Sequence, residues 1–359
     1  MAVSVVTGFP GFIGRRLVAR LVAGDPDERV VALVEERQLE PAREVAAGID
    51  PERIELIAAD ISKPRLGLGE DEYRRLAAEA TRVFHLAAIY NLSVPLAVAQ
   101  AVNVDGTGNV LELCEAAENL DRLVYISTAY VAGLRTGAIY EHELVMGQDF
   151  KNHYESTKFQ AEVWVREWMG RVPTTILRPA IVVGDSKTGE TEKFDGPYYI
   201  LRSISLAHSR GRALPQFGRS DAAFNVVPVD YVVDAIAAAA DDPKTLGETL
   251  HLVDPDPLSA RELFELLSQT YAGRSLSGRI PAALVKAGLH LPAVRNAFSG
   301  APPQSITYLN HPAVYDARRA VELLSPHGLK PPLFTDYVEP VVDFFRRHED
   351  DPALIPPPV

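Results

Sequence analysis

The sequence is poor in cysteine. Its 359 residues include only one, Cys114, so no disulfide can form within the chain. Cys114 lies in the stretch LELCEAAE, where the spacing of apolar residues predicts a buried helix face. A chain without disulfides is typical of a reducing compartment, and we therefore expect a cytoplasmic location.

The sequence also lacks an excess of positive charge. It has 36 Lys and Arg residues against 48 Asp and Glu residues, which gives a formal net charge of −12. Nucleic acids and anionic membranes attract proteins of the opposite sign, so we expect neither as a partner. The nine histidines are not spaced from one another or from Cys114 as metal ligands are, and no metal site is expected.

Long apolar runs are absent as well. No uninterrupted stretch of about 18 apolar residues occurs, so the sequence predicts no membrane-spanning helix. The first residues, Met1–Val6, have neither a basic start nor a cleavage-like site, and they predict a structural strand rather than a signal peptide. With 47% apolar and 23% charged residues, the composition is that of a globular protein with a sizeable core.

Short apolar runs alternate with helical periods through the first 180 residues. The runs that predict strands are Val3–Val6, Val30–Val34, Ile54–Ala58, Val83–Leu86, Leu123–Ser127 and Thr175–Leu177. The stretches that predict helices are Phe12–Val22, Leu39–Ala47, Glu70–Ala80, Leu96–Glu118 and Asn152–Met169. Nearly continuous apolar strands separated by helices indicate a parallel sheet covered on both faces. We therefore expect an α/β fold of the Rossmann type, with a doubly wound parallel sheet.

Three glycines follow the first predicted strand and open the first predicted helix. Gly8 allows a sharp turn, Gly11 allows backbone to approach a pyrophosphate, and Gly14 allows close packing of helix and strand. The amides near Phe12 and Ile13, at the helix N-terminus, then face the anion. Because a strand precedes the motif and a helix follows it, the pattern predicts a dinucleotide site rather than an ordinary turn.

The acid expected for ribose binding follows the second predicted strand. Glu35 stands about 20 residues after Gly14, where such an acid binds the adenosine ribose hydroxyls. It would repel a 2′-phosphate and so favour NAD(H). Arg15, Arg16 and Arg37 lie close enough in the sequence to favour NADP(H) instead, and Glu35 as a solvated surface acid is the alternative interpretation.

The third and fourth predicted strands end in further candidate cofactor contacts. Asp60, followed by Ile61, could accept a hydrogen bond from the adenine amino group, and a helix-capping aspartate is the competing explanation. Ala87 and Ala88 are small enough to let a cofactor lie against the backbone. We expect His85 to be a core histidine rather than a catalytic one.

A tyrosine and a lysine stand four residues apart in the last predicted helix of this region. Tyr154 and Lys158 would project from one helix face, where a neighbouring ammonium lowers the pKa of a phenol. Thr128, at the end of the fifth strand, is the first choice for polarising a substrate carbonyl, and Ser127 is the second. Asn103, grouped with the cofactor contacts, is expected to tie neighbouring strand ends together.

These motifs suggest a division of the chain. Residues 184–197 are rich in turn formers and charges and predict a long loop beside the crevice. The expected parts are a NAD(P)-binding domain at 1–180 to which 225–253 returns, a smaller, interleaved, mainly helical substrate-binding lobe at 181–224 and 254–350, and a tail at 351–359.

In combination, the motifs resemble the extended type of the short-chain dehydrogenase/reductase superfamily. The matching residues are Gly8, Gly11, Gly14, Asp60, His85–Ala88, Asn103–Thr107, Ser127–Thr128, Tyr154, Lys158 and Arg178-Pro179. The resemblance implies that Thr128 orients the substrate, Tyr154 donates the proton and Lys158 lowers the pKa of the tyrosine and binds ribose. It also implies that Arg178-Pro179 lies beside the nicotinamide.

Some segments resemble a narrower branch, the fatty acyl-CoA reductases and thioester reductases. They are Asp60–Leu68, Arg178–Gly189, Asp195–Tyr199 and Asn225–Asp230. This likeness implies reduction of an acyl thioester to an aldehyde, sometimes onward to an alcohol. The expected cofactor is NAD(P)(H): Glu35 favours NAD(H), whereas the resemblance favours NADP(H). The expected substrate is an apolar carbonyl compound, a fatty acyl thioester or a fatty aldehyde.

Two other functions stay open at this point. A nucleotide-sugar epimerase or dehydratase of the same type would need cations for a diphosphate, for which the candidates are Arg202, Arg210, Arg212 and Arg219. A non-catalytic NAD(P)-sensing module would be expected to lose Tyr154 or Lys158, and both are present. The stretch Pro281–Val294 either walls an acyl tunnel or is plain core, and a homodimer through the helices near 96–118 and 152–169 is expected by fold analogy only.

Overall fold

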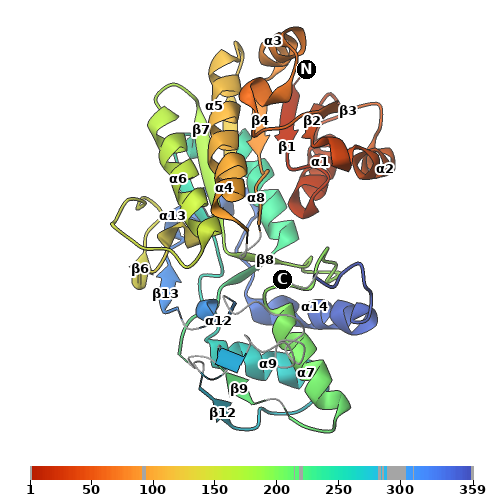
Figure 1. Cartoon of the computed structure of the whole chain (residues 1–359), viewed down its shortest axis with the longest axis vertical. Coiled ribbons are helices and arrows are strands. Elements are labelled where there is room, and N and C mark those ends of the chain that lie inside the picture. Colours follow the sequence, from red (N-terminus) through yellow and green to blue (C-terminus); the bar gives the residue numbers. More distant parts are fainter. Residues whose placement is uncertain are drawn as a thin grey trace.

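A seven-stranded parallel sheet organises the chain in the computed structural model (Figure 1). The structure describes residues 2–90, 94–213, 215–217, 221–281, 284, 287–288, 305–309 and 311–356. The strands of the sheet are β1 (Val3–Thr7), β2 (Arg29–Val34), β3 (Ile54–Ala58), β4 (Arg82–His85), β5 (Arg122–Ile126), β7 (Thr174–Pro179) and β11 (Thr249–Leu252). All six pairings between neighbouring strands are parallel.

The strand order is β11-β7-β5-β4-β1-β2-β3, which confirms the predicted doubly wound sheet. From β1 the chain first builds β2 and β3 on one side, and then continues from β4 on the other side. In such a sheet the crevice for a ligand opens where the order reverses, at the carboxyl ends of β1 and β4.

Helices cover both faces of the sheet. Alternate residues of β1 and β2 enter two separate apolar clusters, so these clusters lie on opposite faces. One cluster includes side chains of α1 (Phe12–Gly24), α2 (Leu39–Ile49), α8 (Val229–Asp241) and α13 (Arg318–Leu324). The other includes side chains of α3 (Glu70–Glu79), α5 (Gly106–Ala116) and α6 (His153–Trp168).

The predicted helix Leu96–Glu118 is divided into three parts. It consists of α4 (Leu96–Ala99), a π-helical turn at Gln100–Asp105, and α5. The wide turn contains the buried Asn103.

A third apolar cluster, built mainly from helices, forms the lower lobe in Figure 1. Its main elements are α7 (Tyr198–Ser209), α9 (Ala260–Ala272) and α14 (Phe334–His348), with α12 (Ser305–Tyr308) beside them. The short strands are β6 (Gly137–Ile139), β8 (Ile181–Val183), β9 (Gln216–Phe217), β10 (Val226–Pro228), β12 (Arg279–Ile280) and β13 (Ala313–Tyr315), which pair as β6–β13, β8–β10 and β9–β12.

One helix differs from the expected division. Helix α13 lies within 254–350, the stretch expected to join the smaller lobe, yet Ala320, Leu323 and Leu324 belong to the apolar cluster of the sheet. Their packing against α8 and β11 explains this, because apolar residues at this helical spacing need a covered surface. Residues 249–252 form β11 at the edge of the main sheet.

The remaining expectations concern a membrane-spanning helix, a metal site, an acyl tunnel, a homodimer and the location of the protein. Within the described ranges, no helix has both the length and the apolar character needed to cross a bilayer. In the same part of the chain, no three or more His, Cys, Asp or Glu side chains are grouped so that they could hold a metal ion. Most of the stretch Pro281–Val294 lies outside the described residues, and the homodimer and the cytoplasmic location stay predictions.

Candidate active site

The turn between β1 and α1 requires each of its three glycines. Gly8 has φ of +88°, and a Cβ there would lie 2.9 Å from Ala87 N. A Cβ on Gly14 would lie 2.4 Å from Gly8 O, and Gly11 N donates a hydrogen bond to Gly8 O at 3.0 Å. The turn is therefore closed on itself and packed against the segment after β4.

The N-terminus of α1 is open to an anion. Gly11 precedes the helix and provides no capping side chain, and the first turn holds no acidic residue. The first amides of a helix have no partner within the helix, and the helix dipole attracts negative charge to them. The residues present therefore fit the pyrophosphate of a dinucleotide, with Phe12 and Ile13 at the contact.

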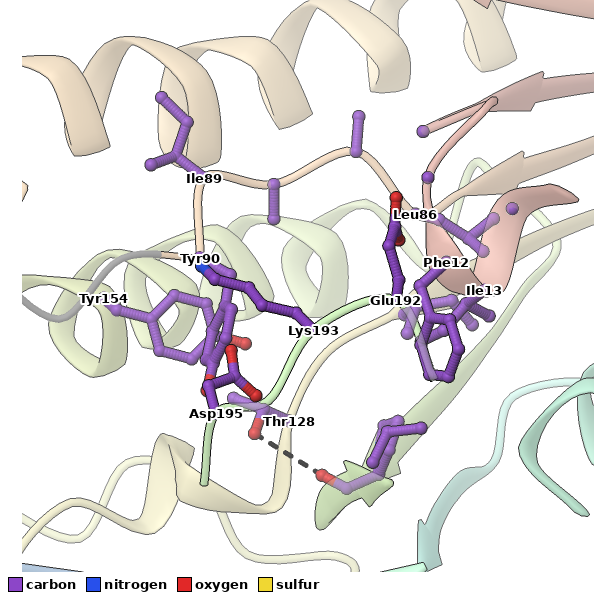
Figure 2. Close-up of a pocket in the computed structure, with 18 of the residues that line it drawn as sticks. Phe12, Ile13, Leu86, Ile89, Tyr90, Thr128, Tyr154, Glu192, Lys193 and Asp195 are labelled. Atoms are coloured by element: carbon purple, nitrogen blue, oxygen red, sulfur yellow. Dashed lines mark hydrogen bonds between the residues drawn. The ribbon is translucent and has the colours of Figure 1, made fainter. Parts of the chain in front are cut away.

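A cavity of about 960 Å³ extends from this turn across the ends of the strands. The predicted cofactor residues that line it are Gly8, Gly11, Phe12, Ile13, Gly14, Glu35, Arg37, Asp60, Ile61, Ala87, Ala88, Lys158 and Pro179. The predicted catalytic residues Thr128 and Tyr154 line the same cavity (Figure 2). The fold therefore brings side chains that are far apart in the sequence to the lining of one cavity.

Asn103 does not line this cavity. Its Oδ1 accepts a hydrogen bond from Ile89 N at 2.8 Å, and its Nδ2 donates to Thr157 Oγ1 at 3.0 Å. The amide therefore joins the segment after β4 to helix α6. It positions lining residues rather than contacting a ligand, which corrects its place among the direct cofactor contacts.

Glu35 and Asp60, the two acids expected to contact the adenosine part of the cofactor, each bind a residue close by in the sequence. Glu35 forms an ion pair with Arg37, with 2.7 Å between Oε1 and Nε, and both side chains are largely exposed. Asp60 Oδ1 accepts hydrogen bonds from the backbone and hydroxyl of Ser62 at 3.0 and 2.6 Å. Hydrogen bonding from Ser62 holds the pKa of Asp60 below its usual value. Asp60 thus closes a turn and is not a helix cap.

The loop that sequence analysis placed beside the crevice reaches the cofactor helix. Glu190 lies 3.3 Å from a guanidinium nitrogen of Arg15 and 2.9 Å from one of Arg16. Both arginines had been candidates for a 2′-phosphate contact, and both are paired here. A turn-rich loop has no periodicity from which these contacts could have been predicted.

Thr128, Tyr154 and Lys158 meet where β5 ends against α6. Thr128 Oγ1 lies 3.4 Å from Pro179 O and accepts from Tyr130 N at 3.3 Å. The Thr128 hydroxyl also lies near enough to the phenol of Tyr154 to lower the pKa of that phenol. Lys158 Nζ donates to the β5 carbonyl of Ile126 at 2.8 Å. The helical spacing of four residues therefore directs both α6 side chains to the end of β5, as predicted.

The electrostatics at this point differ from the expectation. Burial raises the pKa of Tyr154 to about 12, against the lowering effect of the Thr128 hydroxyl. Burial lowers the pKa of Lys158 to about 7, whereas the negative charge of Glu162 raises it. Desolvation by the protein therefore raises the pKa of Tyr154, where a lowering by Lys158 was expected.

Two further polar residues near the site are already paired. Ser127, the second choice for the polarising hydroxyl, donates to Glu162 Oε2 at 2.6 Å. His85 is buried between Thr7 Oγ1 and Thr107 Oγ1, at 2.8 and 3.0 Å from its ring nitrogens. Burial lowers the pKa of His85 to about 3, so it is a neutral core histidine, as expected.

The family of the chain follows from a comparison with known proteins. Residues 6–236 match the model of the NAD-binding family described as "Male sterility protein". The chain belongs to this family. It is therefore an NAD(P)-binding protein of the extended short-chain dehydrogenase/reductase type, and the cofactor class is a nicotinamide dinucleotide.

Two relatives that match this chain are larger proteins. The non-canonical nonribosomal peptide synthetase cpsA of Aspergillus campestris is 28% identical over 291 residues, which are 74% of this chain and 27% of that protein. The fatty acyl-CoA reductase wat of Drosophila melanogaster is 26% identical over 280 residues, which are 66% of this chain and 53% of that protein. The chain thus spans about a quarter of the first and about half of the second.

Solved structures share the fold. The terminal R domain of the myxalamid PKS-NRPS pathway has a TM-score of 0.80 at 24% identity, covering 98% of this chain and 92% of that one. UDP-glucuronic acid 4-epimerase from Bacillus cereus, in complex with NAD, has a TM-score of 0.67 at 20% identity, covering 96% of this chain and 99% of that one.

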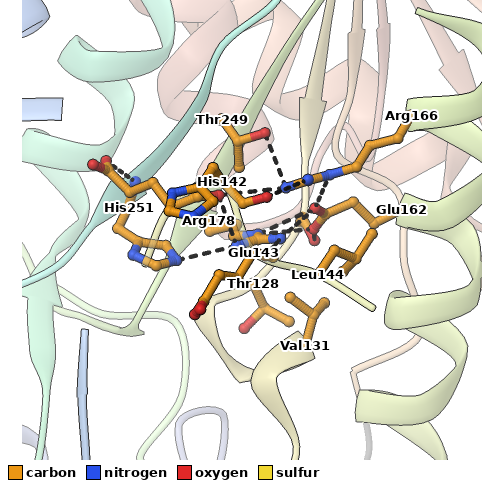
Figure 3. Close-up of polar contacts among 12 residues, drawn as sticks. Thr128, Val131, His142, Glu143, Leu144, Glu162, Arg166, Arg178, Thr249 and His251 are labelled. Carbon is orange, nitrogen blue, oxygen red and sulfur yellow. Dashed lines mark hydrogen bonds and ion pairs between the residues drawn. The ribbon is translucent and has the colours of Figure 1, made fainter. Parts of the chain in front are cut away.

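A buried charged network lies next to Thr128 in this male sterility family member (Figure 3). Arg178 Nε donates to Glu162 Oε2 at 3.0 Å, and its Nη2 donates to Oε1 at 2.6 Å. Arg166 Nε donates to Glu162 Oε1 at 3.1 Å, and Arg178 also donates to Glu141 O and Glu143 O at 3.2 and 2.9 Å. Glu162 and Arg178 are almost fully buried.

Arg178 is therefore not beside the nicotinamide position, contrary to the expectation. Its neighbour Pro179 lines the cavity, but the Arg178 side chain turns to Glu162, because adjacent residues of a strand point to opposite sides. Glu162 itself was missed in the sequence. Its spacing of four residues from Lys158, on the face that carries Tyr154, was the available signal.

We expect the variant Glu162→Gln to have a free energy of unfolding about 3–5 kcal/mol lower than that of the unaltered protein, because Arg178 would stay buried without its anion. Urea unfolding followed by circular dichroism measures this difference. The matched control Glu167→Gln removes an exposed acid from the same helix, and its effect is expected to stay within about 0.5 kcal/mol. Equal stability of Glu162→Gln and the unaltered protein would contradict the assigned role of the pair.

Proposed function

We propose that the chain transfers a hydride between a nicotinamide dinucleotide and the carbonyl of an apolar substrate, a fatty acyl thioester or a fatty aldehyde. The observation that carries this proposal is that Thr128, Tyr154 and Lys158 line the same cavity as the glycine turn. A dinucleotide held at the turn and running past Ala87 and Ala88 would bring its reactive ring to the end of β5.

The roles of the chain's own residues follow from their positions. The bound nicotinamide supplies the hydride. The Thr128 hydroxyl and the Tyr154 phenol both face the point where the carbonyl oxygen would lie, so Thr128 orients and polarises it and Tyr154 donates the proton. Lys158, with a pKa of about 7, holds the ribose hydroxyls and supplies positive charge beside the phenol when it is protonated.

No cysteine thiol of the protein takes part in the proposed reaction. Cys114 is 3% exposed within the apolar cluster beneath α5, and it does not line the cavity. Burial raises the pKa of the Cys114 thiol well above its usual value, so the reactive thiolate is suppressed. Hydride therefore reaches the bound carbonyl directly, and a thioester releases its thiol after the carbonyl carbon has been reduced.

The walls of the cavity support binding of an apolar acyl group. Its apolar lining side chains include Ile89, Val98, Val102, Ile181, Ile200, Phe224 and Leu309. These residues come from both lobes of the fold, so a substrate would lie between the end of the sheet and the helical cluster. Apolar walls with a few polar groups are typical of sites that bind small organic ligands.

The competing functions have less support. Arg202 donates to Glu349 O at 3.2 Å, and neither it nor Arg210 or Arg212 lines the cavity, so these cations are not arranged for the diphosphate of a nucleotide sugar. Arg219 lies outside the described residues. A non-catalytic sensing module would not need both Tyr154 and Lys158 in the cavity.

The variant Tyr154→Phe is expected to lower kcat by about 100-fold or more, since it removes the proton donor and little volume. The rate of oxidation of the reduced cofactor with a long-chain acyl-CoA, and cofactor binding by fluorescence, measure the two effects separately. Cofactor affinity should change little. Tyr140→Phe, which alters an exposed ring outside the cavity, is the control, and an unchanged kcat in Tyr154→Phe would refute the role of Tyr154.

The variant Glu35→Gln is expected to raise the ratio of kcat/KM for NADPH over NADH by about tenfold. It removes the charge that repels a 2′-phosphate and releases Arg37, the ion-pair partner of Glu35, to contact the phosphate. Glu36→Gln, which changes an exposed acid that does not line the cavity, is the matched control. If the ratio were the same in all three proteins, Glu35 would not face the ribose.

A further inference from the structure

Asp195 brings a carboxylate into the substrate end of the cavity. It lies in the segment between β8 and α7, where its backbone carbonyl accepts a hydrogen bond from Tyr198 N at 3.0 Å and thereby fixes the turn before the helix. Its side chain lines the cavity and points toward the region of Tyr154 and Tyr90 (Figure 2). None of the roles proposed above uses this carboxylate.

Three tyrosines line the same part of the cavity as this carboxylate. The rings of Tyr90 and Tyr154 meet edge to face, with 5.4 Å between their centroids. The charge of Asp195 raises the pKa of Tyr90 and, after burial, that of Tyr199, so the carboxylate is close to both phenols. Tyr90 and Tyr199 line the cavity together with Tyr154.

Among the described residues, no side chain forms a direct hydrogen bond or ion pair with the carboxylate of Asp195. Within the described part of the chain, no other residue donates a hydrogen bond to its carboxylate, and no Lys, Arg or His nitrogen lies within 4.0 Å of it. Burial raises the pKa of Asp195 to about 6, so it is mainly ionised at neutral pH. A half-buried carboxylate without a direct partner is unfavourable, and a cation or N–H donor from a ligand would reduce that penalty.

Two other charged residues of the same segment face the cavity. Lys193 lowers the pKa of Asp195 and Glu192 raises it, so their influences on the carboxylate are opposed. Figure 2 shows Glu192 nearer to Phe12 and Leu86, at the cofactor side of the cavity. The net charge of the three side chains is negative, and Asp195 is the acid at the substrate side.

We infer that the substrate carries a protonated nitrogen, which pairs with Asp195 while the rings of Tyr90 and Tyr199 cover it. This inference rests on the proposed function and narrows its substrate class to an acyl thioester or aldehyde whose chain is apolar along the walls of the cavity and ends in an ammonium group. The low dielectric of the cavity strengthens the charge pair, and aromatic faces attract cations. A wholly apolar chain would instead leave the carboxylate desolvated.

The test uses pairs of CoA thioesters that differ in one group. The pairs are 6-aminohexanoyl with heptanoyl and 8-aminooctanoyl with nonanoyl, in which a methyl group replaces the ammonium. The unaltered protein is expected to show at least about tenfold higher kcat/KM for the ammonium member of one or both pairs. A preference for the methyl member in both pairs would overturn the inference.

Asp195→Asn is expected to reduce that preference at least about tenfold, because it removes the charge and keeps the shape. Glu192→Gln is the matched control, since it removes an exposed acid from the same segment, and the preference should change less than about threefold. In the unaltered protein the preference should fall as the pH drops below about 6, where Asp195 becomes neutral, and Asp195→Asn should not show this fall. Equal loss in both variants would overturn the assignment to Asp195.

Binding without turnover separates this inference from the proposed function. Amide analogues of the same acyl pairs, in which nitrogen replaces the thioester sulfur, resist reduction, and calorimetry measures their affinity in the presence of the reduced cofactor. Tighter binding of the ammonium analogue supports the inference even if no thioester is reduced, a result that would refute only the proposed reaction. Equal affinity of the two analogues overturns the inference and leaves the reaction untouched.

Discussion

The ion pair between Glu162 and Arg178 is the constraint on which the geometry of the site depends. Both side chains are buried, and a charge in the interior is tolerated only where its partners are fixed, so the pair holds α6 against the ends of β5 and β7. Tyr154 and Lys158 stand two turns and one turn before Glu162 on the same helix. The pair thus sets the distance between these side chains and Thr128 without contacting a ligand.

A second set of contacts closes the site from the other lobe. The loop between β8 and α7 joins the cofactor helix through Glu190, which pairs with Arg15 and Arg16. On its other side, Gly189 packs so closely against α14 that a Cβ would lie 2.0 Å from Pro340 O. Because both contacts fix the loop, Asp195 reaches the substrate end of the cavity, where the two lobes form one site.

The sequence predicted those features that depend on local pattern. Apolar runs of strand length specified the parallel sheet, and the spacing of four residues between Tyr154 and Lys158 specified their common face. Features that depend on the direction of a side chain in space were not predictable. Arg178 was expected near the cofactor and turns into the core, and the pKa of Tyr154 reflects burial, which spacing does not reveal. Asp195 lies in a loop without periodicity, so only its surroundings in the fold distinguish it.

We propose that hydride passes from the nicotinamide to a carbonyl carbon held at Thr128 and Tyr154. The most direct test of this transfer uses a reduced cofactor deuterated at the transferring carbon of the nicotinamide, together with an acyl thioester, and mass spectrometry of the trapped aldehyde. Such a transfer predicts one deuterium on the carbonyl carbon of the aldehyde for each cofactor oxidised. Aldehyde that forms without deuterium from either face of the labelled cofactor would contradict it.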